Sequence, residues 1–567
     1  MASHLLSYLQ RPRQNGYIFE TVPGRLEYIA SRFPDKEAYV FLSPGKPRVS
    51  ITGAELLEKS RAIATGLVRR GIKRGDVVAV SQPNNIDGLL CIFGVIASGA
   101  TLLNLVFRRP DGSDVRAIME KAGNCSALII HVGHNNATLK ACLRFIDAIS
   151  DNGKVVSKSF PTIHTLVVSS NCNIDGQKFD TLTELMNEQR SGSSLPSLDP
   201  DDTALLFETS GSTGKPKLVV HSHRTMLMCG IHLQDSMGYK SHDVVYNERK
   251  MQWILGFPFQ YLLNGVTTVT TEYRFESLKE QCLFAFSTMQ QEKCNIACLL
   301  PITLHGLAHI VLENESNFIL DNIHTGGSPV ATICLAVLGI LTKKVTICYG
   351  SSEAGFLTSK TVSNISEYAD YSSGFPHQGV EVKIIGTNGN IVERGHDGEI
   401  YARTPAMYKG YLHEFEKTKK SLNESGWFKT DDVGHITTEG ELVAHGRMSE
   451  LILCGSAKVL PVKLEKIIRN HPDVYDVVVI PIPDPIKFQV ACACIIFKPN
   501  AEKGTDDVQK FCESSEPDIA VNEYSNVILQ YLPQHYLRFL EFPRTNTGKI
   551  NKLELVQEAA KRLNIDM

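Results

Sequence analysis

The sequence predicts an α/β protein in which parallel sheets covered by helices precede a small β-barrel and a compact α+β unit. Segments with helical periodicity alternate with runs of β-branched residues over residues 52–350, and such alternation is typical of parallel sheets. From about Val380 the pattern changes to short strands separated by turns, as in a small barrel or an antiparallel sheet. After Gly446 another compact unit with mixed helical and strand patterns begins.

The first alternating set opens with a helical pattern over residues 53–71. The strand-like runs that follow it are residues 77–82, 101–107, 126–133 and 164–170. Because parallel strands need long crossover connections, helices between these runs indicate one parallel sheet.

The longest apolar stretch runs from Gly88 to Phe107 and approaches the length of a membrane span. Polar and small residues interrupt it at Gly94, Ser98 and Asn104. We interpret it as a buried helix followed by a buried strand.

A second alternating set follows the loop of residues 208–217. Its strand-like runs are residues 295–301, 317–327 and 343–350. The last two end in Gly-rich turns, and open α/β sheets bind ligands where their strands end.

Composition excludes several functional classes. The 567 residues are too many for one core, and 43% hydrophobic with 21% charged residues is ordinary for a globular protein. The net charge of -3 gives no general attraction to nucleic acid or to an anionic membrane. The fourteen scattered cysteines lack the paired spacing of a zinc site, which favours free buried thiols in a reducing compartment.

The stretch "ETSGSTGKPK", residues 208–217, combines hydroxyl side chains, glycines and lysines. A loop of this kind exposes backbone N–H groups and hydroxyl donors that suit a polyphosphate. It is not a Walker A motif, because only two residues separate Gly211 from Gly214 and Pro216 follows the first lysine. Taken alone, the same run also fits a flexible surface loop.

Four further motifs join this loop in a fixed order. They are "HTGGSPV" (324–330), "CYGSSEAG" (348–355), "GWFKTDDVG" (426–434) with "HGRMSELI" (445–452), and "PRTNTGKINK" (543–552). Together with the loop they resemble the adenylate-forming superfamily, in particular its acyl-CoA synthetase branch of the medium-chain acyl-CoA ligase type. The resemblance covers nearly the whole chain.

The resemblance implies a two-step reaction on a carboxylic acid. ATP activates the acid to an acyl-adenylate with release of pyrophosphate, and the acyl group is then transferred to coenzyme A, with Mg²⁺ bound to the phosphates. The apolar segments 253–265 and 298–311 indicate a fatty or other apolar acid. The partners expected are therefore small molecules, without nucleic acid and without an integral membrane segment.

The resemblance also assigns the phosphate and metal groups. The phosphate loop would contribute Thr209, Ser210, Gly211, Ser212, Thr213, Gly214 and Lys217. Glu353 matches the magnesium-binding glutamate, and Ser352 would support a phosphate oxygen. Without the other motifs, Glu353 would be interpreted as a helix-start acid.

The resemblance also assigns residues that contact the nucleotide and the acyl group. Gly326, Gly327 and Ser328 match the segment that lines the adenine and acyl pocket, and Tyr349 and Gly350 are expected to contact the nucleotide. Asp432 would accept hydrogen bonds from the ribose hydroxyls, and Arg447 would reach ribose or phosphate. For each of these two residues the alternative is a surface ion pair.

Three residues are candidates for catalysis: Lys549, Glu353 and Thr213. Lys549 matches the lysine that neutralises charge developing on the α-phosphate. In isolation it would be a solvated charge near the end of the sequence.

By the same resemblance, residues 1–446 form the adenylation domain and residues 447–567 form a mobile lid that alternates between the two half-reactions. Five positions depart from the family pattern, namely Asp431, Ser449, Ser456, Lys463 and Gln260. Asp431 replaces a glycine with a second acid beside Asp432, and like charge there is expected to weaken ATP binding. Gln260 stands where many relatives carry a pocket-gating histidine.

Two other functions stay open. One is an adenylating enzyme with a different second step, such as a luciferase-like monooxygenase or another ligase, because the loop at Ser456 is altered. The other is a catalytically silent nucleotide or acyl sensor, suggested by Asp431 and Ser449. The resemblance begins within the first dozen residues, so we expect a cytoplasmic protein, with the mitochondrion as the alternative.

Overall fold

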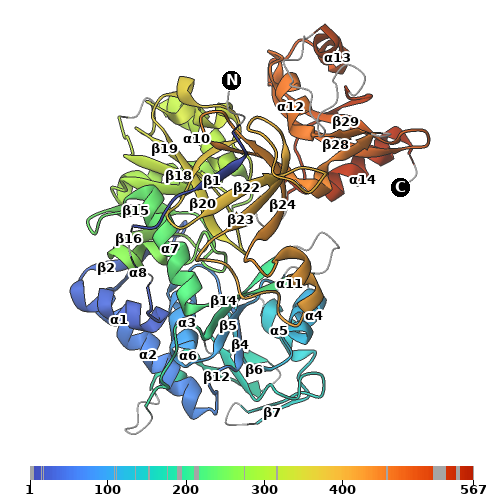
Figure 1. Ribbon diagram of the computed structural model, residues 1–567. Helices are drawn as coiled ribbons and strands as arrows, with labels where there is room; N and C mark the ends of the chain where they lie inside the picture. Colours follow the sequence, from blue (N-terminus) through green and yellow to red (C-terminus); the bar gives the residue numbers. More distant parts are fainter. Residues whose placement is uncertain are drawn as a thin grey trace.

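The computed structural model describes residues 5–14, 16, 18–107, 109, 111–133, 136–150, 154–170, 172–174, 177–187, 194–209, 216–273, 275–314, 317–454, 457–514, 532–544 and 550–565. Three large sheets organise these residues. Figure 1 shows the first sheet in the lower part of the molecule, the second above it, and the third in the orange-to-red unit at the upper right.

The first sheet has seven strands and is parallel except at one edge. In spatial order they are β12 (Asp180–Thr181), β9 (Thr165–Val168), β6 (Cys125–Ile130), β4 (Val77–Ser81), β5 (Thr101–Asn104), β13 (Thr203–Thr209) and β14 (Lys217–Ser222). Only β14 runs antiparallel, as the second strand of a hairpin with β13. The parallel sheet predicted from the first alternating set is confirmed.

The second sheet has fourteen strands. Its parallel part is β19 (Val345–Ser351), β18 (Asn322–Gly326), β17 (Ile296–Leu299), β15 (Val244–Asn247), β16 (Thr267–Thr270) and β2 (Glu37–Phe41), with β3 (Val49–Thr52) antiparallel at the edge. Its other part is antiparallel: β20 (Gly355–Val362), β21 (Ser372–Pro376), β25 (Leu442–Arg447), β24 (Phe428–Ile436), β23 (Gly398–Arg403), β22 (Glu381–Ile385) and β1 (Tyr8–Gln10).

This antiparallel part replaces the small β-barrel that the sequence predicted. Over the described residues the strand order ends at β1 and at β3 without closing. The short strands continue the parallel sheet because β20 pairs with β19 in the antiparallel direction and β21 pairs with β20 on its other side. The alternative expectation, an antiparallel sheet, describes this region correctly.

Side chains that alternate along the strands divide the large unit into layers. In β4, Val78 and Val80 join the core between the two sheets, while Val77 and Ala79 face the outer side. The helices packed in the central core are α1 (Val22–Arg32), α2 (Gly53–Arg69), α3 (Ile86–Ala97), α7 (His223–Met237) and α8 (Phe259–Asn264). The outer helices are α4 (Ser113–Ala122) and α5 (Ala137–Leu143) on the first sheet, and α9 (Leu278–Gln291) and α10 (Pro301–Asn314) on the second.

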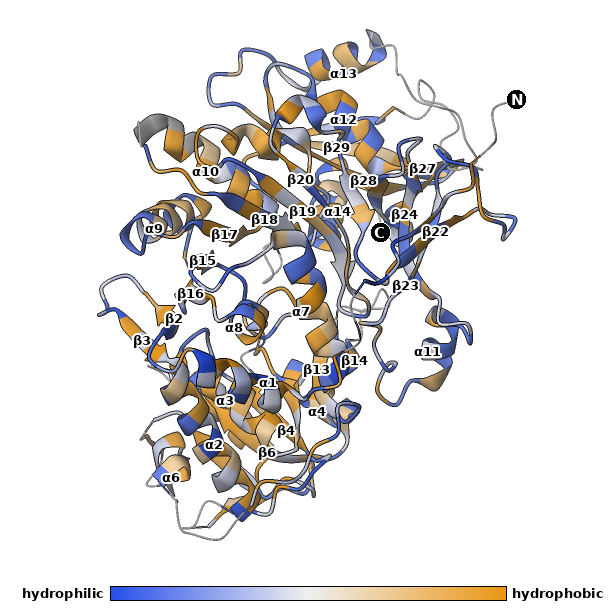
Figure 2. Ribbon diagram, turned by 60° about the vertical axis from the view of Figure 1, so that its left-hand side comes forward, coloured by the Kyte–Doolittle hydropathy of each residue, from blue (hydrophilic) through white to orange (hydrophobic). Residues whose placement is uncertain are grey.

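Helix α3 and strand β5 are the apolar stretch that the sequence identified. From Gly88 through Ala97 every residue of α3 is buried, and so is all of β5. Figure 2 shows the same hydrophobic character along α3 and the neighbouring strands β4 and β6. The interpretation as a buried helix and strand is therefore confirmed. Among the described residues, no helix combines the length and the apolar character that crossing a membrane requires.

The C-terminal unit is built on the third sheet, which has five strands. They are β26 (Ile452–Cys454), β27 (Ala457–Val459), β28 (Val474–Asp484), β29 (Phe488–Phe497) and β30 (His535–Phe539). Helices α12 (Pro461–Arg469) and α13 (Thr505–Ser514) cover one face, and α14 (Lys552–Leu563) covers the other. This unit has its own apolar cores, which agrees with a separate C-terminal domain, but the division at residues 446 and 447 stays a prediction.

The remaining elements are short. They are β7 (Ala148–Ile149), β8 (Val155–Val156), β10 (Asn173–Ile174), β11 (Gln177–Lys178), α6 (Leu182–Asn187), α11 (Phe415–Ser421), and the 3₁₀ turns η1 (Thr332–Val337), η2 (Ile365–Glu367) and η3 (Met448–Glu450). All fourteen cysteines are free thiols, and all except Cys172 are buried. The expectation of free buried thiols is confirmed.

Candidate active site

The phosphate loop predicted from the sequence connects β13 and β14. Thr209 and Lys217 are cross-strand partners at the end of this hairpin, so the intervening loop leaves from the carboxyl end of β13, the edge where α/β sheets bind ligands. The loop residues Ser210, Gly211, Ser212, Thr213 and Gly214 lie outside the described residues.

Lys217 and Glu353 both contact Tyr411, the first at its ring and the second at its hydroxyl. The Lys217 ammonium lies 4.6 Å from the centre of the Tyr411 ring, and the Tyr411 hydroxyl donates a hydrogen bond of 2.9 Å to Oε1 of Glu353. Burial, followed by the charge of Glu353, raises the pKa of Tyr411, so the hydroxyl stays protonated and donates. The base of the phosphate loop and the magnesium-ligand candidate therefore lie close together.

Tyr411 is held there by the backbone. The segment around it runs beside β14, where the Val220 amide donates to Gly410 at 3.1 Å and the Leu412 amide donates to Leu218 at 2.9 Å. Tyr411 was not predicted from the sequence. Its only signal was a tyrosine in a Gly-Tyr turn, which is too common to indicate function.

His221 fixes the turn that carries Ser352 and Glu353. Its Nε2 lies 2.6 Å from the Ser352 carbonyl oxygen and its Nδ1 lies 3.0 Å from Oγ1 of Thr225. Burial lowers the pKa of His221 to about 4, so the ring is neutral and Nε2–H donates to the carbonyl. This histidine, also missed in the sequence, positions the turn against β14.

Glycines allow the turns of the site to pack closely. A β-carbon on Gly350 would lie 2.0 Å from the Gly355 carbonyl oxygen, and one on Gly326 would lie 2.3 Å from that of Cys348. Gly327 has φ of +85°, a conformation that favours glycine. Because β18 and β19 pair in parallel with Gly326 opposite Cys348, the turn with Gly327 and the exposed Ser328 lies beside Tyr349.

Asp432 and Arg447 form the ribose end of the candidate site. They are opposite residues of β24 and β25, and Arg447 Nε lies 3.0 Å from Oδ1 of Asp432. The Tyr349 hydroxyl donates to Oδ2 of the same carboxylate at 2.7 Å. The carboxylate is thus oriented by two donors while the arginine stays half-exposed.

Asp431 occupies a bulge in β24. Its φ of +60° lies in the left-handed region, and the register with β23 shifts at this point. The Asp432 amide donates to Oγ1 of Thr430 at 3.1 Å. This turn exposes Asp431 and directs Asp432 inward, which gives the physical reason for a glycine preference at position 431.

The two ends of the site interact electrostatically. Burial raises the pKa of Asp432, and the charges of Asp431 and Glu353 raise it further, while Arg447 opposes them. The phosphate and ribose groups therefore belong to one electrostatic environment. The structure brings together eleven of the predicted residues, namely Thr209, Lys217, Gly326, Gly327, Ser328, Tyr349, Gly350, Ser352, Glu353, Asp432 and Arg447. Lys549 lies outside the described residues.

Gln260, the departure in the acyl segment, is fully enclosed. It is 1% exposed, and its Nε2 lies 3.7 Å from Sγ of Cys298. Phe257 and Phe259 beside it belong to the central core. The Tyr239 hydroxyl lies 3.5 Å from the same sulfur, so the amide of Gln260 belongs to a small buried polar group inside an apolar core.

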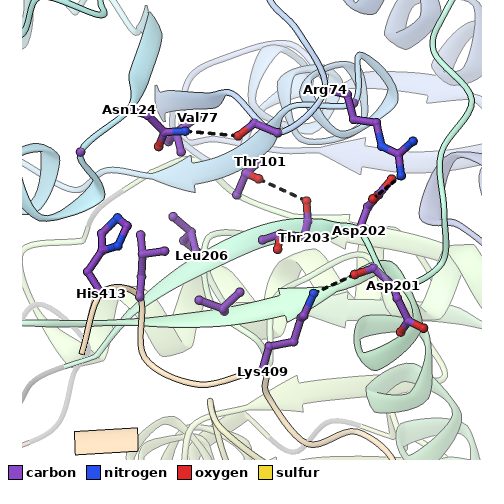
Figure 3. A pocket seen from close by; sticks show the side chains of 15 residues that line it. Arg74, Val77, Thr101, Asn124, Asp201, Asp202, Thr203, Leu206, Lys409 and His413 are labelled. Atoms are coloured by element: carbon purple, nitrogen blue, oxygen red, sulfur yellow. Dashed lines mark hydrogen bonds and ion pairs between the residues drawn. The ribbon is translucent and has the colours of Figure 1, made fainter. Parts of the chain in front are cut away.

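A cavity of about 710 Å³ lies elsewhere, near the start of β13. Figure 3 shows Thr203, Leu206 and His413 lining it, with Arg74 paired to Asp202 and Lys409 donating to the backbone of Asp201. The phosphate loop leaves from the opposite end of β13, so this cavity is distinct from the candidate active site.

The described residues fit a magnesium-bound polyphosphate. Glu353 presents a partly exposed carboxylate, the hard oxygen donor that Mg²⁺ prefers, and only its Oε1 is used by Tyr411. Lys217 at the base of a loop rich in donors supplies the positive charge that phosphates require.

Comparison with known proteins identifies the family. The AMP-binding enzyme family matches residues 26–412, and the AMP-binding enzyme C-terminal domain matches residues 463–549. Because the first match covers more than half of the 567 residues, the chain belongs to the AMP-binding enzyme family.

Individual relatives share this organisation. The medium-chain acyl-CoA ligase ACSF2, mitochondrial, of Danio rerio is 26% identical over 96% of this chain and 89% of its own length. The oxalate–CoA ligase of Arabidopsis thaliana is 26% identical over 95% of this chain and 98% of its own. The crystal structure of an anthranilate CoA ligase in complex with anthranoyl-AMP superposes with a TM-score of 0.77 at 19% identity, covering 96% of this chain and 98% of that one, which supports the same fold.

Proposed function

We propose that this protein is an AMP-forming acid–CoA ligase that activates an apolar, fatty carboxylic acid. The observation that carries the proposal is the convergence of Lys217 and Glu353, which share Tyr411, with the Asp432–Arg447 pair, which contacts Tyr349. The relatives named above, both CoA ligases, support the same reaction. The apolar segments 253–265 and 298–311 support an apolar acid as the substrate.

In the first step a carboxylate oxygen of the acid attacks the α-phosphorus of ATP. The bond between the α-phosphorus and its bridging oxygen breaks, and pyrophosphate leaves. Lys217 and the loop donors Ser212 and Thr213 hold the departing phosphates, and Lys549 balances the charge on the α-phosphate. Mg²⁺, when bound at Glu353, neutralises phosphate oxygens.

In the second step the thiol sulfur of coenzyme A attacks the acyl carbon and AMP leaves as its phosphate anion. Asp432 and Arg447 hold the nucleotide throughout, because ribose does not react in either step. The thiol proton passes to solvent or to AMP.

A panel of acids with ATP, Mg²⁺ and coenzyme A tests the proposal. We expect AMP release and a CoA thioester with apolar acids, and Glu353→Gln should lower the rate about a hundredfold because a metal ligand is lost. The control Glu58→Gln alters an exposed carboxylate of α2 and should leave the rate unchanged. Adenylate without thioester would instead favour a different second step, and ATP binding without pyrophosphate release would favour a silent sensor.

Lys549 is best tested through the separate half-reactions. Lys549→Ala should lower adenylation by about a hundredfold, about 3 kcal/mol, yet retain thioester formation from prepared acyl-adenylate. Lys561→Ala removes an exposed lysine of α14 in the same unit and serves as the control. Equal loss of both half-reactions would argue against a lid that uses Lys549 in only one orientation.

For location we propose the cytoplasm. The free buried thiols support a reducing compartment, whereas the name of the ACSF2 relatives includes mitochondrial. Imaging the full-length protein with a tag at its C-terminus distinguishes the two compartments.

A further inference from the structure

Three side chains outside the nucleotide site converge on one point. Asp397 directly precedes β23, His435 lies on β24, and His445 lies on β25, and these three strands are neighbours in the sheet. Oδ1 of Asp397 lies 2.8 Å from Nδ1 of His435 and 3.0 Å from Nε2 of His445. The two ring nitrogens lie 3.2 Å apart, so the three donor atoms form a compact triangle.

The triangle has the dimensions of a metal-ligand set. Ligand atoms at about 2.0–2.1 Å from one ion, with angles of about 90–109°, lie about 2.8–3.4 Å from each other. The observed edges of 2.8, 3.0 and 3.2 Å are close to this range. All three atoms lie within hydrogen-bond distance of one another, so Oδ1 and the two ring nitrogens converge on one small space.

The three side chains are largely shielded from solvent, and a lysine balances the charge of Asp397. The Asp397 side chain is 1% exposed, His445 is buried, and His435 is 23% exposed. The Lys463 ammonium from α12 lies 2.8 Å from the second oxygen, Oδ2. It therefore compensates the carboxylate in this structure and leaves Oδ1 facing the two imidazoles.

We propose that Asp397, His435 and His445 form a binding site for a divalent transition-metal ion. Two imidazoles and one carboxylate suit Zn²⁺ and the related first-row ions better than Mg²⁺ or Ca²⁺, which prefer oxygen ligands. The partial exposure of His435 provides access for the ion. The site is separate from Glu353, although it shares β24 with Asp432 and β25 with Arg447.

The consequence concerns the C-terminal unit. An ion on Oδ1 and the ammonium of Lys463 on Oδ2 share one carboxylate, so the ion weakens the contact that α12 makes with the large unit. The metal site thus lies where it can influence the docking of the predicted lid.

The experiment uses the full-length protein, treated with a chelator, dialysed and then titrated with Co²⁺. Visible absorption bands of nitrogen- and oxygen-ligated cobalt should appear with one ion per chain and should disappear when Zn²⁺ is added. Intense near-ultraviolet bands would indicate that thiols bind the ion, and would overturn the proposal.

Variants locate the site. His435→Ala should weaken Zn²⁺ binding, measured by competition with a chromogenic chelator, by about a hundredfold, because one of three ligands is lost. Asp397→Asn keeps the shape of the side chain and should have a similar effect. The control His242→Ala removes an exposed histidine and should leave binding unchanged.

Thermal unfolding of each variant separates loss of ligand from loss of fold. If Asp397→Asn does not fold, the metal affinity of His435→Ala alone tests the proposal. His435 has the most exposed side chain of the three, so its loss should disturb the fold least. Absence of cobalt bands in the wild-type protein, or unchanged affinity in a folded His435→Ala variant, would overturn the proposal.

Discussion

Tyr411 connects the cation and the anion of the phosphate end of the site. Its ring faces the Lys217 ammonium, and its hydroxyl donates to Glu353. The two contacts use different parts of one side chain, so each can be removed without the other. Phenylalanine keeps the ring contact and removes only the hydrogen bond.

Tyr411→Phe is therefore expected to affect Glu353 alone. A hydrogen bond to a charged group contributes about 1.5–3 kcal/mol, and its loss should lower the adenylation rate at limiting Mg²⁺ by about tenfold. The rate as a function of Mg²⁺ concentration provides the measurement. Tyr401→Phe on β23 is the control and should leave it unchanged; a Tyr411→Phe profile identical to wild type would show that the hydroxyl does not position Glu353.

Asp431 combines two unfavourable features, a left-handed backbone with φ of +60° and a charge that raises the pKa of Asp432. Asp431→Gly should increase the free energy of unfolding by about 0.5–1 kcal/mol and strengthen ATP binding, measured by calorimetry. Asp431→Asn tolerates the left-handed conformation but lacks the charge. We expect it to strengthen ATP binding with little change in stability, whereas weaker ATP binding in both variants would contradict the argument.

At the residue scale, the sequence predicted charged candidate residues of the site more readily than the residues that position them. Asp432, Arg447 and Glu353 were predicted because the motifs that contain them resemble those of the adenylate-forming superfamily. Tyr411 and His221 were not, because their roles depend on pairing between distant segments, such as Leu412 beside Leu218. Nothing in the local pattern of either residue indicates such a contact.

At the scale of elements, the site depends on turns that only glycine permits. The turn after β19 places Ser352 and Glu353, and it brings Gly350 against the Gly355 carbonyl oxygen. His221 then fixes this turn through the Ser352 carbonyl. A side chain at position 350 must therefore move the turn or β20.

Gly350→Ala should lower the free energy of unfolding by about 1–3 kcal/mol, the usual cost of overpacking. Adenylation should fall further than stability explains, because Glu353 is displaced from Tyr411. Chemical denaturation and AMP release measure the two effects. Gly504→Ala, where a β-carbon meets no atom within 4 Å, is the control, and equal behaviour of the two variants would contradict the close packing.

The elements themselves were predictable where the hydrophobic period was clear. The helix over residues 53–71 and the buried pair α3 and β5 follow directly from periodicity. The small barrel was wrong because strand spacing does not determine pairing partners. Two pairings determine that this sheet does not close. Strand β1 pairs with β22, far away in the sequence, and β20 and β21 extend the sheet from β19.

At the scale of the whole molecule, one core between the two large sheets unites segments from α1 to β25. It also encloses several histidines. Burial lowers the pKa of His221 and His223 to about 4, and that of His232 and His324 to about 3. All four are therefore neutral in the folded protein at neutral pH.

This enclosure predicts acid lability. Unfolded histidines bind a proton below about pH 6.5, whereas the buried ones stay neutral until about pH 4 or 3. The unfolded state therefore binds more protons between these limits, and stability falls as the pH falls. Each histidine should lower the free energy of unfolding by about 2 kcal/mol between pH 7 and pH 5. Burial raises the pKa of Glu248 and Glu465, so these two groups bind more protons in the folded state and act in the opposite direction as the pH falls toward about 4.5.

Thermal unfolding between pH 5 and pH 7.5 tests this directly. The midpoint should fall steeply toward pH 5, and His221→Gln, which retains a donor for the Ser352 carbonyl, should reduce the slope by close to one proton. The exposed His242→Gln provides the control and should leave the slope unchanged. A midpoint that does not change between pH 7 and pH 5 would mean that these histidines reach water in the folded protein, and that the two large sheets do not enclose one continuous core.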